Sequence, residues 1–181
     1  MKLALLTAIC WAAFAASLSS CANVPRTLRR ASELEKLGAF LGHWNTSGEM
    51  KDTPYSKART KSNDEMTCSW TPNHGFLVCD QIIHTLTETR NDLSIYTYNE
   101  KQHTFSFFGL SRNDTEARTT KLTIEGSLWT YFDESDEGGK HVQFRTTNQF
   151  SSPSTVIWRS EYSEDGVHWT LMGQGTDTRI N

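Results

Sequence analysis

Apolar and polar residues alternate along most of the chain, and this period of two predicts β-strands. In segment 140–150, Val142 and Phe144 share one face, whereas Gln143 and Arg145 share the other. The segments with this pattern are 44–52, 60–71, 75–85, 92–98, 103–110, 117–124, 127–133, 140–150, 155–163 and 167–174, with a last short one at 176–180. Because they are rich in aromatic and β-branched residues, the chain is predicted to be all-β.

Short turns join these segments, so consecutive strands are predicted to run antiparallel as a meander. The turn Asn99–Gln102, for example, would place Tyr98 opposite His103. A meander of about 8–10 strands either closes or leaves long exposed edges, and closure is the usual solution. We therefore predict a closed barrel, with the longer loops 50–60 and 111–117 at its mouth.

One short helix is predicted before the first strand. Ser32 is a favoured N-cap, and Glu35 three residues later completes a capping box. The apolar face of this helix comprises Leu34, Leu37, Phe40 and Leu41. Gly42 is a natural stop, so the helix has roughly ten residues and is too short to be stable alone. We expect it to dock on the barrel and cap one end.

The N-terminal residues 1–21 predict that the protein is exported from the cytoplasm. Lys2 precedes an apolar run from Leu3 to Ala16, which has secretory length and is too short to span a membrane. The residues 18–21, Leu-Ser-Ser-Cys, resemble a bacterial lipobox. The resemblance implies cleavage before Cys21 and lipidation of its thiol.

The expected organisation is a lipoprotein signal peptide at 1–20, a tether at 21–31 and a single barrel domain at 32–181. It places the protein in the bacterial cell envelope, at the outer membrane or the periplasmic face, with the lipid anchor as its only membrane contact. Ordinary cleavage after Ala22 is the open alternative and would give a secreted protein.

The cysteines predict one disulfide. Cys68 and Cys79 are the pair left after export, in a compartment that favours oxidation. If Asn73 and His74 form the centre of the turn between two strands, Cys68 lies directly opposite Cys79. Directly opposed strand residues are close enough for a disulfide. Two buried free thiols are the alternative.

Charge excludes one class of partner. Lysine and arginine number 18 and aspartate and glutamate 21, which gives a net charge of −3. The charges are spread along the chain without a basic patch, so no nucleic-acid partner is expected. The oligomeric state is not determined by these features.

A Gly-x-Trp at Gly42–Trp44, placed just before the first strand, resembles the opening of lipocalins and related calycin barrels. A Ser-x-Asp-Gly-x-x-Trp hairpin at 163–169 and a late Arg179 add to a resemblance to bacterial lipocalin-like (calycin-type) secreted and lipoprotein domains, a family of unknown function. The resemblance implies that the helix closes one end of the barrel and that Arg179 stacks on Trp44.

The resemblance also implies a function, the binding of a small apolar or amphipathic molecule inside the barrel. The aromatic residues expected to line such a cavity are Trp44, Tyr96, Phe108, Trp129 and Trp158. The same aromatics suit a filled core. A structural or protein-interaction module with a packed interior is therefore the first alternative.

We find no catalytic motif: there is no Gly-x-Ser-x-Gly, no phosphate-binding glycine loop and no HExxH. The six histidines form no cluster with metal-ligand spacing, so neither a metal nor another cofactor is expected. The nitrobindin-like relatives of the calycins hold haem through a barrel histidine. His84 or His168 would be the matching residue, which makes haem binding the second alternative.

Overall fold

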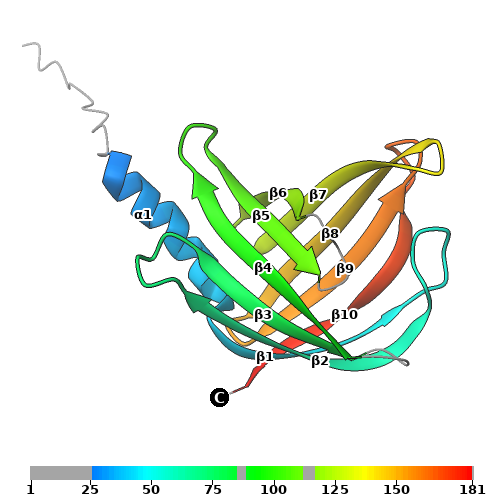
Figure 1. Ribbon diagram of the computed structural model, residues 1–181, viewed down its shortest axis with the longest axis horizontal. Coiled ribbons are helices and arrows are strands. Elements are labelled where there is room, and N and C mark those ends of the chain that lie inside the picture. Colours follow the sequence, from blue (N-terminus) through cyan, green and yellow to red (C-terminus); the bar gives the residue numbers. More distant parts are fainter. Residues whose placement is uncertain (1–25, 85–88, 112–116, 181) are drawn as a thin grey trace, which may run out of the picture.

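The computed structural model describes residues 26–84, 89–111 and 117–180, which form one helix, one 3₁₀ turn and ten strands (Figure 1). The helix α1 spans Arg26–Leu37 and the turn η1 spans Gly38–Phe40. The strands are β1 Gly42–Met50, β2 Arg59–Trp70, β3 Leu77–His84, β4 Thr89–Asn99, β5 Thr104–Ser111, β6 Arg118–Glu125, β7 Leu128–Glu137, β8 Lys140–Ser152, β9 Thr155–Ser163 and β10 Thr170–Ile180.

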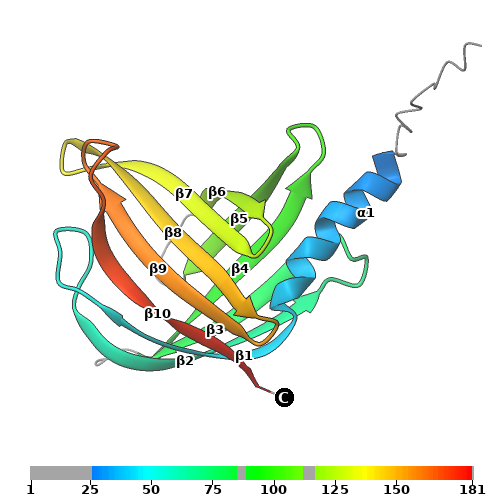
Figure 2. The ribbon, with the colours of Figure 1, turned by 180° about the vertical axis from the view of Figure 1, so that it is seen from behind.

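The ten strands form a closed antiparallel barrel, as predicted. Each strand pairs with its neighbours in sequence, and β1 also pairs with β10, which closes the ring (Figure 2). The segments predicted as two strands, 167–174 and 176–180, form one continuous strand, β10, which begins at Thr170 and not at residue 167. Gly175 does not interrupt it, because this residue is held in the ladder by Gly48 on one side and Trp158 on the other.

The register of one hairpin is confirmed and that of another is corrected. Cys68 pairs with Cys79 across β2 and β3, as the turn predicted. Tyr98, in contrast, pairs with Phe105 and not with His103. His103 adopts a left-handed φ of 53°, which places it in the turn and starts β5 one residue later than predicted.

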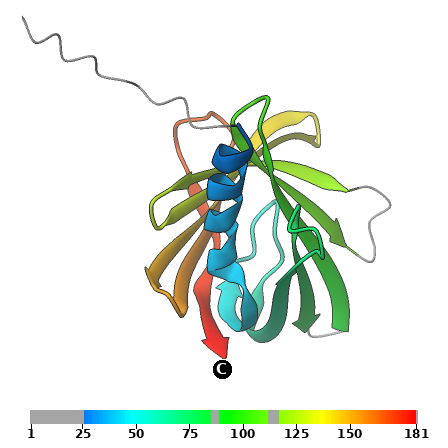
Figure 3. The same cartoon turned by 90° about the vertical axis from the view of Figure 1, so that its left-hand side faces the viewer.

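The helix begins at Arg26 and not at Ser32, which lies inside it and is exposed. The predicted N-cap was therefore wrong: the sequence Leu-Arg-Arg-Ala at 28–31 consists of good helix formers, and these outweigh the local capping preference of serine. Figure 3 shows α1 across one end of the barrel. Leu34 and Leu37 are buried there, so the predicted docking of the helix is present. No helix in the described ranges is long and apolar enough to cross a membrane.

Candidate functional site

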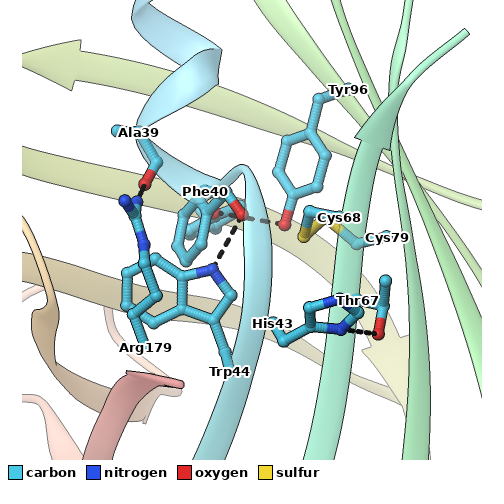
Figure 4. The surroundings of a disulfide bond; sticks show 10 residues. Ala39, Phe40, His43, Trp44, Thr67, Cys68, Cys79, Tyr96 and Arg179 are labelled. Carbon is cyan, nitrogen blue, oxygen red and sulfur yellow. Dashed lines mark hydrogen bonds between the residues drawn. A yellow bond between two sulfur atoms is a disulfide. The ribbon is translucent and has the colours of Figure 1, made fainter. Parts of the chain in front are cut away.

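The end of the barrel beneath the helix is closed by Trp44. Its indole is fully buried, and its Nε1 donates a hydrogen bond to the carbonyl oxygen of Phe40 at 2.8 Å (Figure 4). The guanidinium carbon of Arg179 lies 4.6 Å from the centre of the Trp44 ring. The same guanidinium donates a hydrogen bond from Nη2 to the carbonyl oxygen of Ala39 at 2.7 Å. Arg179 thus joins the last strand to the first strand and to η1.

A layer of packed aromatic rings fills this closed end. The ring of Phe40 lies 5.0 Å, centre to centre, from the rings of both Trp129 and Phe150. Cys68 and Cys79 belong to the same buried cluster and form a disulfide, which confirms the predicted bond (Figure 4). This layer is a packed core of the barrel.

Above the aromatic layer the barrel contains a cavity of about 730 Å³. Cavities of a few hundred to about a thousand Å³ accept small organic molecules. Apolar side chains supply much of the wall, among them Met66, Ile83, Phe107, Phe144, Trp158 and Met172. The barrel interior is therefore packed at the helix end and hollow beyond it.

Two ion pairs form part of the cavity wall. Nη2 of Arg59 lies 3.1 Å from Oδ2 of Asp64, and Nη2 of Arg90 lies 3.0 Å from Oδ2 of Asp92. Asp64 is only 2% exposed, and its Oδ1 accepts a hydrogen bond from the backbone N–H of His84 at 3.0 Å. Each of these two arginines is thus neutralised by a neighbouring carboxylate.

Asp177 is a buried carboxyl group of the cavity wall that has no such cation beside it among the described residues. It is 6% exposed and pairs across β1 and β10 with Thr46, which in turn pairs with Asp64 on β2. Its Oδ1 has no hydrogen-bond partner among the described residues. The pKa of Asp177 is raised to about 6, chiefly by burial; a hydrogen bond from Thr46 lowers this pKa, and the charge of Asp64 raises it.

Two tyrosines complete the polar part of the wall. The hydroxyl of Tyr131 donates to that of Tyr96 across 3.5 Å, and both rings are buried. Burial raises the pKa of Tyr96 to about 12 and that of Tyr131 well above its ordinary value, and the negative charge of Asp177 acts in the same direction on both. Both hydroxyls are therefore neutral at physiological pH.

Trp158 lies over two glycines of the inner wall. A Cβ atom at Gly175 would come within 2.6 Å of Cζ2 of Trp158, and one at Gly48 would lie 2.9 Å from Cη2. Gly48 and Gly175 are directly paired across β1 and β10. The missing side chains provide the space that the indole occupies, and Nε1 of Trp158 has no hydrogen-bond partner among the described residues.

The loop between β1 and β2 lies at the barrel end away from the helix (Figure 1). This loop contains Tyr55. The Tyr55 ring lies 5.7 Å from that of Phe144, which lines the cavity, and 4.7 Å from that of Tyr162. Its hydroxyl donates to Oε1 of Glu164 at 2.7 Å, and Lys140 donates to the other oxygen of the same carboxylate at 2.8 Å. This loop is thus fastened to the rim beside the cavity.

The five aromatic residues expected to line a cavity occupy three different places. Tyr96 and Trp158 are in the cavity wall, whereas Trp44 and Trp129 belong to the packed layer beneath it. Phe108 is not in the wall; the adjacent Phe107 is, because successive strand residues face opposite sides.

Sequence reasoning missed the charged residues of the wall, namely Arg59, Asp64, Arg90, Asp92, Arg118, Asp133 and Asp177. One signal could have indicated Asp177: it lies two positions before Arg179, which was expected to face inward. The arginines offered no such signal, because their inward direction depends on a register that only the closed barrel defines.

The histidines do not fit a haem site. His168 has 87% of its side chain exposed, and its Nδ1 is hydrogen-bonded to Oδ2 of Asp165 at 2.6 Å. His84 is also exposed, and neither residue lines the cavity. Within the described ranges, no group of three or more histidine, cysteine, aspartate and glutamate side chains is arranged to hold a metal ion.

No known protein family and no curated protein matches this sequence. Solved structures that share the fold include the following two. Rv2717c from M. tuberculosis superposes with a TM-score of 0.56 and 12% identity, covering 87% of this chain and 99% of that one. The S-type phycobiliprotein lyase CPES from Guillardia theta gives a TM-score of 0.55 and 8% identity, covering 81% and 92%. The protein is therefore a closed antiparallel barrel of the lipocalin-like type.

Proposed function

We propose that this protein binds a small amphipathic molecule inside its barrel. The observation that carries the proposal is the cavity of about 730 Å³, whose wall combines apolar side chains with buried polar atoms that have no partner among the described residues. A buried polar group without a partner costs about 1–3 kcal/mol. A ligand that supplies the missing hydrogen bonds recovers this energy, whereas a purely apolar ligand does not.

A packed barrel that serves as a structural module explains the interior less well. Packing to native density is found in the aromatic layer around Phe40, and the cavity begins directly above it. A protein that needed only a stable scaffold would gain by filling this space, because empty volume destabilises a fold. We therefore prefer ligand binding.

The test measures the binding of naphthylmethanol, a neutral aromatic probe, to the purified mature protein. The fluorescence of the probe reports binding. Thr120 lines the cavity, and the adjacent Thr119 is exposed on the outer face. Thr120→Trp places an indole inside the cavity and should weaken binding, while Thr119→Trp adds the same side chain outside and should not change it. The absence of binding to the wild-type protein, or equal binding by both variants, would refute the proposal.

We propose further that the mature protein begins at Cys21, carries lipid on that thiol and is anchored in the bacterial cell envelope. The support is the lipobox-like sequence at 18–21, which lies outside the described residues. Cys21→Ser should leave the signal peptide uncleaved by the lipoprotein route and remove the lipid mass. Mass spectrometry of the processed protein measures both, and an unlipidated chain that begins after Ala22 would show that the protein is secreted instead.

A further inference from the structure

We propose that the ligand is an organic cation, an apolar amine or quaternary ammonium compound whose charged group is held by Asp177 among aromatic rings. This inference rests on the proposed function and specifies its ligand class. It follows from three properties of the cavity wall: the pairing of its charges, the rings around Asp177, and the position of its remaining positive charge.

Asp64 and Asp177 are the fully buried carboxyl groups of the wall, and Asp177 is the one that lacks a cationic partner among the described residues. Arg59 is paired with Asp64 and Arg90 with Asp92, at 3.1 and 3.0 Å. Asp177 has no ion pair with a cation in the described part of the chain, and its Oδ1 makes no hydrogen bond there. Since a buried carboxylate is costly unless it is paired, this position favours a ligand that brings a positive charge.

Aromatic rings line the same cavity as Asp177. Tyr96 on β4 and Tyr131 on β7 both interact electrostatically with Asp177, and Trp158 lies on β9, next to β10. All three rings line the cavity. Tryptophan and tyrosine faces attract organic cations, and a desolvated contact contributes about 2 kcal/mol or more. A carboxylate combined with such rings matches the chemistry of an ammonium group with apolar substituents.

The positive charge of the wall does not suggest an anionic ligand. Arg179 shares the inner face of β10 with Asp177, but its guanidinium is held by the Trp44 ring and the carbonyl oxygen of Ala39. Arg118 lines the cavity at an exposed position, where water screens its charge. The buried part of the wall therefore presents a carboxylate to the ligand.

The experiment compares three ligands with the same naphthalene body and different charge. Naphthylmethyl-trimethylammonium should bind the mature protein about tenfold or more tightly than neutral naphthylmethanol, and naphthylacetate should bind more weakly than either. Asp177→Asn should remove the preference for the cation, so that naphthylmethyl-trimethylammonium and naphthylmethanol bind the variant with similar affinity. The matched control is Asp133→Asn, which removes a half-exposed carboxylate from the same cavity and should retain the preference.

A pH titration of the wild-type protein gives the same test without a substitution. The trimethylammonium group stays charged at every pH, so a loss of its preference reports protonation of the protein. The groups facing Asp177 are Asp64 with its partner Arg59, and the neutral hydroxyls of Tyr96 and Tyr131. Because the pKa of Asp177 is raised to about 6, the preference should be full at pH 7.5 and largely lost at pH 5.

The outcomes separate the two proposals. Three results would overturn the proposed ligand class but not the proposed binding function. They are binding of naphthylmethanol without a preference for the cation, a preference for naphthylacetate, and a cation preference that persists in Asp177→Asn. If none of the three compounds binds, the proposed function itself fails.

Discussion

The indole of Trp158 occupies the space that a side chain at Gly48 would need. A Cβ atom at Gly48 would lie 2.8 Å from the carbonyl oxygen of Gln174 and 2.9 Å from Cη2 of Trp158. Real side chains do not approach this closely, so glycine at this position allows the ring to lie in the cavity wall. The wall of the proposed binding site thus depends on a residue that contributes no side chain to it.

Gly48→Ala should therefore displace the Trp158 ring. We expect a loss of about 1–3 kcal/mol in the free energy of unfolding, as for other overpacked interiors, together with weaker binding of naphthylmethanol. Urea unfolding and probe fluorescence measure the two effects. Ser47→Ala, at the exposed neighbouring position, should change neither; a fully stable Gly48→Ala protein with unchanged binding would contradict this packing.

Arg179→Lys should loosen the closed end of the barrel. Lysine keeps the positive charge but loses the planar group that stacks on Trp44 and the hydrogen bond to the carbonyl oxygen of Ala39. We expect the free energy of unfolding to fall by about 1–2 kcal/mol. Thr178→Ser, on the outer face of the same strand, is the control. A lysine variant as stable as the wild type would mean that the contact contributes nothing.

The disulfide between Cys68 and Cys79 closes a short loop between paired strands. Replacing both residues by serine should lower the free energy of unfolding by about 2–3 kcal/mol, because the unfolded chain gains freedom. Thiol counting on unfolded, unreduced protein that carries Cys10→Ala and Cys21→Ser tests the bond directly. No free thiol is expected, and two free thiols would show that the bond is absent.

Asp177→Asn should stabilise the protein at neutral pH. The pKa of this carboxyl is raised to about 6 in the folded state from an ordinary value of 3.8, so folding favours its neutral form. That stabilising contribution is complete below about pH 4 and is lost as the pH rises through 6. Asparagine resembles the neutral acid at every pH.

The variant should consequently exceed the wild type by up to about 3 kcal/mol at pH 7.5, and this difference should nearly vanish at pH 4. Urea unfolding at the two pH values, with Asp133→Asn as the control, measures the difference. A variant that is less stable than the wild type at pH 7.5 would show that the Asp177 carboxylate already has a stabilising partner inside the protein.

The closed antiparallel barrel could be predicted because its signals are local. Period-two alternation defines strands, and short turns fix their order and direction. The turn around Asn73 even fixed the pairing of Cys68 with Cys79. The pairing predicted from the turn after Tyr98 was wrong, because nothing in the sequence of this turn shows that His103 adopts a left-handed conformation.

The cavity could be predicted only in part, because its walls depend on closure. Alternation assigns residues to two faces of each strand but does not say which face is inside, and Phe108 was therefore chosen where Phe107 lines the cavity. The sequence also does not show how far along the barrel axis each inward side chain lies. Trp44 and Tyr96 are both aromatic and inward, yet one fills the base and the other faces the cavity.

Native mass spectrometry of the mature protein, purified without detergent and sprayed with naphthylmethanol in excess, tests the central claim most directly. If the barrel binds a small molecule, the wild type and Thr119→Trp should carry one added mass, either a ligand retained from the cell or the probe. Thr120→Trp should carry a smaller fraction of either. A wild-type protein that stays at its bare mass even with the probe in excess would contradict a ligand-binding barrel.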